Sequence, residues 1–153
     1  MSVSSPHVVI LEGEPVLADA FAARFARERV RVTALTDFVV EPADLLGMLP
    51  DLVVLDPSWG FGLGGLSLLR RLRADPDGRE LPVITSPTIT PINRERYGAE
   101  LRGLGAVLLP DPFDAKDLLA AARAAVARAR EARQRSDSAL ARLSSGRTKL
   151  PPF

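Results

Sequence analysis

The sequence predicts an α/β fold in which a five-stranded parallel sheet lies between two layers of helices. Short apolar runs alternate five times with longer segments whose apolar residues recur every three or four positions, a pattern typical of strands followed by amphipathic helices. The clearest run, residues 52–55, is apolar throughout and ends at Asp56, which indicates a strand buried on both faces. Regular alternation of strand and helix favours parallel strands joined by right-handed crossovers.

Composition sets limits on the kind of protein. The 153 residues are 46% hydrophobic and 25% charged with a net charge of +1, so we expect one ordered domain with its own core. Disulfides and thiolate chemistry are excluded because the chain has no cysteine, and its single histidine cannot form a histidine metal cluster. No apolar run reaches the roughly 20 residues of a membrane helix, and residues 1–6 lack signal-peptide features. We therefore expect a soluble cytoplasmic protein.

The first half of the chain contains three of the predicted strands. The apolar residues 7–11 form the first, and Pro15 suits the first position of a helix over 15–28. Residues 30–35 give a second, more exposed strand. A short helix over 42–49 then leads into the strand that ends at Asp56.

In the second half, a helix begins near Gly64 or Gly65, and residues 81–86 form the fourth strand. Gly98 weakens the next helix, over 93–103, which precedes a strand over 105–109. Asp114 is a good N-cap for a last helix that runs to Arg133 or beyond, and we expect the chain to fray from Ser136. The predicted organisation is a domain over 1–133 and a basic, flexible tail over 134–153.

Polar residues follow several of these strands. Parallel strands end at the same edge of a sheet, so we expect this edge to collect several acids and hydroxyls. They are Glu12, Glu14, Asp56, Thr85, Ser86 and Asp111.

The order of segments resembles the receiver domain of bacterial response regulators over residues 7–130. The first strand with Glu12-Gly13-Glu14-Pro15 is similar to that family's acidic "D-D-E-P" turn, and residues 50–56 to its "P-D-L-V-L-L-D" strand. Residues 65–73, residues 81–84 and Asp111-Pro112-Phe113 resemble its third helix, fourth strand and "K-P-F" segment. The resemblance implies a flavodoxin-like, doubly wound sheet of strand order 2-1-3-4-5. It also implies a cis bond between Asp111 and Pro112.

The resemblance further implies that Asp56 occupies the phosphoacceptor position. Receivers bind Mg²⁺ through an acidic pair and the acceptor, and a lysine neutralises the phosphoryl group. Here the first acid is Glu12, the second is Gly13, and Asp111 replaces the lysine. Pro87 and Leu108 stand at the two switch positions, although Thr85, Ser86 or Thr88 could supply the hydroxyl.

Without a nearby cation, converging carboxylates would repel a phosphoryl dianion. We therefore expect Asp56 to be an unused acceptor that caps nearby backbone N–H groups. No cofactor is expected. Mg²⁺ binding is the less favoured alternative, with Glu12, Glu14 and Asp56 as weak ligand candidates. Solvation of Glu12 and a first-turn role for Glu14 are favoured over metal binding, and Asp111 either caps the last helix or holds a turn.

The aromatic pair Trp59 and Phe61 lies in a glycine-rich loop. We weigh two roles for Trp59 equally: a contact for a partner, or a cover over the acidic pocket. Gly60, Gly62 and Gly65 read G-x-G-x-x-G, but this motif follows the third strand and lacks a ribose-binding acid. A loop is therefore favoured over a phosphate site.

Charge is divided unevenly, with a net −5 over residues 1–115 and a net +6 over 116–153. Without interleaved aromatics, the basic end is better interpreted as a solvated helix face than as a nucleic-acid surface. Leu140, Leu143 and Leu150 could instead dock on a partner or a second copy.

The favoured interpretation is a stand-alone, atypical receiver without enzymatic activity or a DNA-binding domain, acting as a phosphorylation-independent protein-interaction module in bacterial signalling. Its expected surface, for a partner or a homodimer, is the fourth helix, fifth strand and last helix. The replaced switch positions Pro87 and Leu108 predict one fixed conformation. The alternatives are a conventional receiver phosphorylated on Asp56 with Mg²⁺, and a flavodoxin-like domain that binds a flavin or nucleotide.

Overall fold

The computed structural model describes residues 5–36, 40–60, 62–86 and 91–147. Five strands form one parallel sheet of order β2-β1-β3-β4-β5, as predicted. The strands are β1 (His7–Leu11), β2 (Arg31–Leu35), β3 (Leu52–Leu55), β4 (Val83–Thr85) and β5 (Val107–Leu108). The helices between and after them are α1 (Pro15–Ala26), α2 (Pro42–Gly47), α3 (Gly64–Ala74), α4 (Pro91–Gly103) and α5 (Ala115–Arg147).

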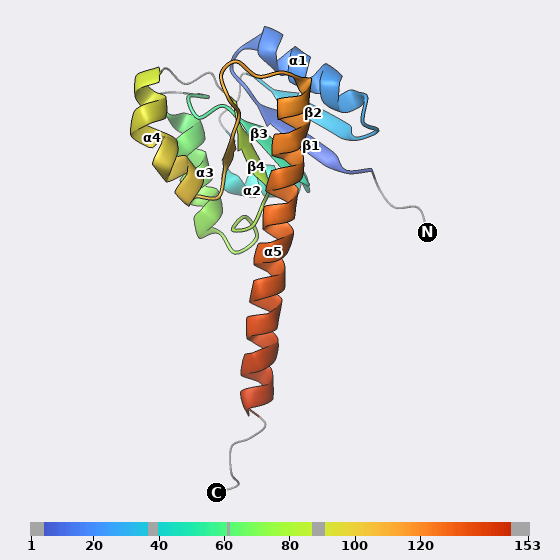
Figure 1. The fold of residues 1–153 in the computed structure, drawn as a ribbon, viewed down its shortest axis with the longest axis vertical. Helices are drawn as coiled ribbons and strands as arrows, with labels where there is room; N and C mark the ends of the chain where they lie inside the picture. The colour runs from blue at the N-terminus through green and yellow to red at the C-terminus, as the bar shows by residue number, and fades with distance from the viewer. Residues whose placement is uncertain (1–4, 37–39, 61, 87–90, 148–153) are drawn as a thin grey trace, which may run out of the picture.

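Helices cover both faces of the sheet (Figure 1), and each face has its own core. On one face, Phe21 and Phe25 of α1 and Leu118 of α5 pack against the strands. On the other, α2, α3 and α4 contribute leucines such as Leu45, Leu69 and Leu101. Central strands β1 and β3 are buried along their whole length, whereas edge strand β2 is partly exposed, as its sequence predicted. The described helices include none that is long and apolar enough to cross a membrane.

Local signals placed the starts of α1 and α2 correctly, whereas α4 begins at Pro91, two residues before the predicted start at 93. Pro15 and Pro42 each stand in the first turn of a helix, where a missing N–H costs nothing. Before α5, Asp114 Oδ1 accepts a hydrogen bond from the Asp117 backbone N–H at 2.9 Å, and Asp117 Oδ2 accepts one from the Asp114 N–H at 3.0 Å. This reciprocal capping, led by the Asp117 N–H, lowers the pKa of Asp114.

The last helix is longer than predicted. It continues to Arg147, so the predicted fraying from Ser136 is wrong for residues 136–147. Alanine, arginine and leucine, all strong helix formers, make up half of this stretch and outnumber its serines. The helix runs past the sheet and away from the rest of the molecule (Figure 1). The domain boundary predicted near residue 133 falls inside α5.

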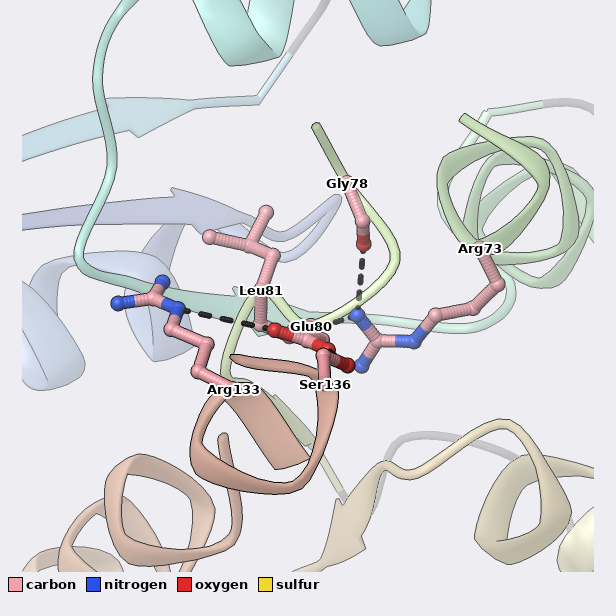
Figure 2. Close-up of polar contacts among 6 residues, drawn as sticks. All are labelled: Arg73, Gly78, Glu80, Leu81, Arg133 and Ser136. Carbon is pink, nitrogen blue, oxygen red and sulfur yellow. Dashed lines mark hydrogen bonds and ion pairs between the residues drawn. The ribbon is translucent and has the colours of Figure 1, made fainter. Parts of the chain in front are cut away.

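Polar contacts fix the end of the sheet where the strands begin (Figure 2). Arg73, at the end of α3, donates from Nε to the Leu104 carbonyl at 2.6 Å and from Nη1 to the carbonyls of Gly78 and Leu81 at 2.9 and 2.7 Å. On α5, Ser136 Oγ donates to Glu80 at 2.9 Å, and Arg133 Nε lies 3.9 Å from the same carboxylate. Burial, with a smaller effect of Arg128, lowers the pKa of Arg73.

Arg73→Gln should lower the free energy of unfolding by about 2–4 kcal/mol, because three partly buried carbonyls lose a charged donor. Urea denaturation checks this value. The matched control is Arg71→Gln, which removes only an exposed ion pair with Glu41 and should cost less than about 1 kcal/mol. Equal losses in the two variants would contradict the structural role of Arg73.

Gly65 brings α3 against the end of β3. A Cβ at this position would lie 2.0 Å from the Asp56 carbonyl oxygen and 2.9 Å from the Pro57 Cα. Gly65→Ala should therefore destabilise the fold by about 3 kcal/mol or more. In the same denaturation assay Gly47→Ala, whose Cβ meets nothing within 4 Å, should be neutral or stabilising. A neutral Gly65→Ala would contradict this packing.

Candidate functional site

The candidate site lies where the order of the strands reverses, at the carboxyl ends of β1, β3 and β4. Main-chain hydrogen bonds extend the sheet by one residue beyond each strand: Asp56 N donates to the Leu11 carbonyl at 2.8 Å, and Ser86 N to the Leu55 carbonyl at 3.0 Å. Glu12, Asp56 and Ser86 thus end neighbouring strands, and all three are buried. Open α/β sheets bind their ligands at such a point.

Asp56 is held by the residue two positions later. Its Oδ1 accepts hydrogen bonds from the Ser58 backbone N–H at 2.9 Å and from the Ser58 hydroxyl at 2.6 Å. Its side chain is 5% exposed. This arrangement agrees with the predicted capping role. Sequence analysis did not single out Ser58, although Asp-Pro-Ser is a pattern typical of a turn closed by an aspartate side chain.

Glu12 differs from its prediction. We expected a solvated carboxyl group, but the side chain is completely buried. Burial, and after it the nearby Asp56 carboxylate, raises the pKa of Glu12 to about 7, against the opposing effect of the Ser86 hydroxyl and the Glu14 N–H. Among the described residues, Glu12 Oε2 has no hydrogen-bond partner. Glu12 is buried because the position after a central strand is covered on both faces of the sheet.

Gly13 leaves the position facing Asp56 without a side chain. A Cβ built on Gly13 would lie 3.9 Å from Asp56 Oδ2, so an acidic side chain there would reach the Asp56 carboxylate. Glu14 is exposed and serves instead as the N-cap of α1, accepting from the Val16 N–H at 3.4 Å. This is close to the helix role that the sequence favoured over metal binding.

The acids at this edge of the sheet lack ion pairs with the described basic residues. Within the described ranges, neither Glu12, Asp56 nor Asp111 makes an ion pair with a basic residue. Asp111 is exposed and precedes a cis bond to Pro112, as predicted. Across the same ranges, no group of three histidine or acidic side chains is arranged to hold a metal ion. The site therefore offers two carboxyl groups, and one of them, Glu12, is only partly ionised at neutral pH.

The aromatic and switch residues have different outcomes. Trp59 is only 3% exposed and packs in the core with α2 and α3, so the exposed partner contact is a wrong prediction for its ring. The partner contact was one of two roles that the sequence left equally open, and the burial of Trp59 leaves no exposed ring for it. Leu108 is half-buried against the same core. Phe61, Pro87 and Thr88 lie outside the described residues.

The glycine motif has a packing role at its end. Gly60 and Gly62 have φ of 84° and 59°, a region that favours glycine, and Gly65 allows the close approach of α3. This agrees with a loop and does not require a phosphate ligand.

Glu12 should make stability depend on pH. Its pKa is about 7 in the folded chain against an ordinary value of 4.5, so the stabilising contribution is complete below about pH 4.5 and is lost as the pH rises through 7. Between pH 5 and 7.5 the wild type should lose about 1–3 kcal/mol more than Glu12→Gln does, measured by urea denaturation. The control Glu14→Gln, at an exposed cap, should keep the wild-type dependence. The same pH slope in Glu12→Gln and wild type would contradict this assignment.

Comparisons with known proteins agree with the fold. No family model and no curated protein matches the sequence. Among solved structures, the receiver domain of a sensor histidine kinase from Pseudomonas aeruginosa PAO1, solved with a magnesium ion in its active-site cleft, matches with 19% identity and a TM-score of 0.64, over 81% of this chain and 99% of the other. The signal receiver domain of an HD domain-containing protein from Pseudomonas fluorescens matches with 16% identity and a TM-score of 0.66, over 88% and 96%.

The chemotaxis response regulator CheY4 of Vibrio cholerae matches with 14% identity and a TM-score of 0.61, over 80% of this chain and 99% of the other. These similarities cover nearly the whole length of each receiver, and the strand order is the same as the one described above. The chain therefore has the fold of response-regulator receiver domains.

Proposed function

We propose that this chain is an atypical receiver of two-component signalling that works as a protein-interaction module without phosphorylation of Asp56. It acts in the bacterial cytoplasm and is not an enzyme. The observation that carries the proposal is the environment of the Asp56 carboxylate: a buried Glu12 on one side, Gly13 opposite Oδ2, and no ion pair with a described basic residue.

Phosphoryl transfer to a carboxylate depends on positive charge, supplied by a metal ion and a basic side chain. The donor set at this edge does not fit the Mg²⁺ that the fold implies. Gly13 has no ligand atom, Asp56 Oδ1 is engaged by Ser58, and the raised pKa of Glu12 leaves it only partly ionised at neutral pH. With Asp111 in place of the lysine, a phosphoryl group on Asp56 would add negative charge to an acidic pocket.

A constant conformation is the second part of the proposal. Arg70 Nε and Nη2 donate to the two carboxylate oxygens of Glu100 at 2.7 and 2.8 Å, which joins α3 to α4. Leu108 packs against the core next to α4 and provides no polar switch group. We infer that α4, β5 and α5 present one fixed surface to a protein partner. Ile92 of α4, 77% exposed, is its clearest apolar contact.

A conventional phosphoacceptor is the main alternative, since Asp56 itself has been retained. No specific feature favours the flavin or nucleotide alternative, because the close contacts of Gly65 explain the end of the glycine motif by packing.

Incubation with Mg²⁺ and acetyl phosphate should leave the mass of the wild type unchanged. The variant Gly13→Asp with Asp111→Lys restores a carboxylate beside Asp56 Oδ2 and a cation, and should gain one phosphoryl group. Adding Asp56→Asn to that variant should abolish the gain, and intact-protein mass spectrometry measures all three. Phosphorylation of the wild type that disappears in Asp56→Asn would sink the proposal in favour of the conventional receiver.

A further inference from the structure

The end of α5 is an apolar helix face without a partner among the described residues. Residues 133–145 are all exposed, and Leu140 and Leu143 are 64% and 67% exposed. The last described link to the body is the contact of Arg133 and Ser136 with Glu80 (Figure 2). A helix of this length is marginal on its own in water. In residues 137–147, here called the α5 extension, positions 137–145 therefore lack the packing that normally stabilises a helix.

The two leucines continue a face that is buried earlier in the same helix. Leu118, Ala122, Ala125 and Ala129 face the sheet, and the same spacing of three and four residues leads on to Leu140 and Leu143. The α5 extension thus carries the same apolar face with which the first part of α5 packs on the sheet. It lies beyond the end of that sheet (Figure 1).

Beside the first half of α5 lies a groove that is apolar, like the helix face that carries Leu140 and Leu143. It has a volume of about 420 Å³ and lies between α1, α5 and the beginning of the sheet, lined by Val8, Phe25, Val30, Leu52, Leu119 and Val126. Two kinds of charge border it: Arg123 and Arg130 on the α5 wall, and Glu28 and Asp51 on the opposite wall. Neither arginine makes an ion pair within the described part of the chain.

We propose that the α5 extension of a second copy of this chain occupies this groove, so that two chains pair through antiparallel α5 helices about a two-fold axis. Each extension then covers the groove of the other chain, and the contact is made twice. Overlap of residues 119–143 with their counterparts would be about 36 Å long at 1.5 Å per residue. Leu140 and Leu143 would rest on the apolar floor of the groove.

Charge complementarity supports the second copy as the occupant. Asp137 lies on the same flank of α5 as Arg123 and Arg130, because the positions are separated by one or two heptads. When Leu140 and Leu143 lie at the level of residues 117–122 of the other helix, Asp137 falls opposite Arg123. Arg133 then comes to the level of Val126, on the side where Asp51 borders the adjoining part of the groove. The Arg123–Asp137 pair would therefore form twice, once on each side of the two-fold axis, and the Arg130 residues of the two chains would lie at the axis itself.

A parallel pairing of the two α5 helices would neither pair these charges nor fill the grooves. It would place Arg123 against Arg123 and Asp137 against Asp137, and the two grooves would remain open. The α4-β5-α5 surface of the proposed function would remain accessible in the antiparallel pair, because the groove lies on the α1 side of α5. The inference therefore stands independently of the role of Asp56.

Oligomeric state is the first test, by size-exclusion chromatography with light scattering on the full chain at about 100 µM. The wild type should be a dimer, and Leu140→Asp with Leu143→Asp should be a monomer with an otherwise folded body by circular dichroism. The control Ile92→Asp changes a residue on α4 that is even more exposed than the two leucines, and this variant should remain a dimer. A monomeric wild type, or a dimer lost in Ile92→Asp and kept in the leucine variant, would overturn the proposal.

Cross-linking with a short bismaleimide tests the direction, and the absence of native cysteine makes the experiment clean. A mixture of Arg123→Cys and tagged Asp137→Cys chains should give a cross-linked heterodimer, in which the second Arg123–Asp137 contact is still intact. Neither variant should cross-link alone. Efficient cross-linking of Asp137→Cys with itself would indicate a parallel pair and would contradict the inference.

Discussion

Two carboxyl groups meet at the end of the central strands, and most features of the site follow from this contact. Register places Glu12 and Asp56 on the neighbouring strands β1 and β3, and both are buried. Two charges of the same sign are costly in such a place. The structure limits the cost by raising the pKa of Glu12 to about 7, so that its carboxyl group is only partly ionised at neutral pH, and by giving Asp56 the hydrogen bonds of Ser58. A third negative group, such as a phosphoryl group, would add electrostatic repulsion to this site.

The loop after β3 belongs to the same arrangement. Ser58 caps Asp56, Trp59 turns into the core, and Gly65 lets α3 begin directly against the carbonyl of Asp56. Each contact restricts the segment that carries the acceptor position. A receiver that depends on phosphorylation needs two states of different partner affinity, whereas these contacts favour one. The proposed signalling role therefore rests on a constant surface at α4, β5 and α5.

Much of the fold could be predicted from the sequence, because its central strands are short, purely apolar and bounded by turn residues. Residues 52–55 and the prolines at 15 and 42 set the strand and helix boundaries locally. The length of α5 was underestimated, because serines after residue 135 suggest fraying although the neighbouring alanines and arginines favour a helix. Leu140 and Leu143 were recognised as docking candidates, but the groove they could fill is made by α1, α5 and the sheet and has no local signal.

The site was less predictable, since burial is decided by tertiary packing. Asp56 and the replacement at Gly13 follow from the order of motifs, and so does the cis bond at Pro112. The complete burial of Glu12 and the inward position of Trp59 depend on how the helices pack onto the sheet, which no local pattern indicates. Ser58 was within reach, because the Asp-Pro-Ser turn is a local pattern.

The central claim is that the pocket around Asp56 does not accept a phosphoryl group. Trp59 is the only tryptophan in the chain and follows directly after the residue that caps Asp56, so its fluorescence reports on the pocket itself. The most direct measurement is a titration with beryllofluoride, a phosphoryl mimic, in the presence of Mg²⁺. Our account predicts no saturable change in the Trp59 emission of the wild type, and a saturable change in Gly13→Asp with Asp111→Lys. A saturable change in the wild type that is absent from Asp56→Asn would contradict it.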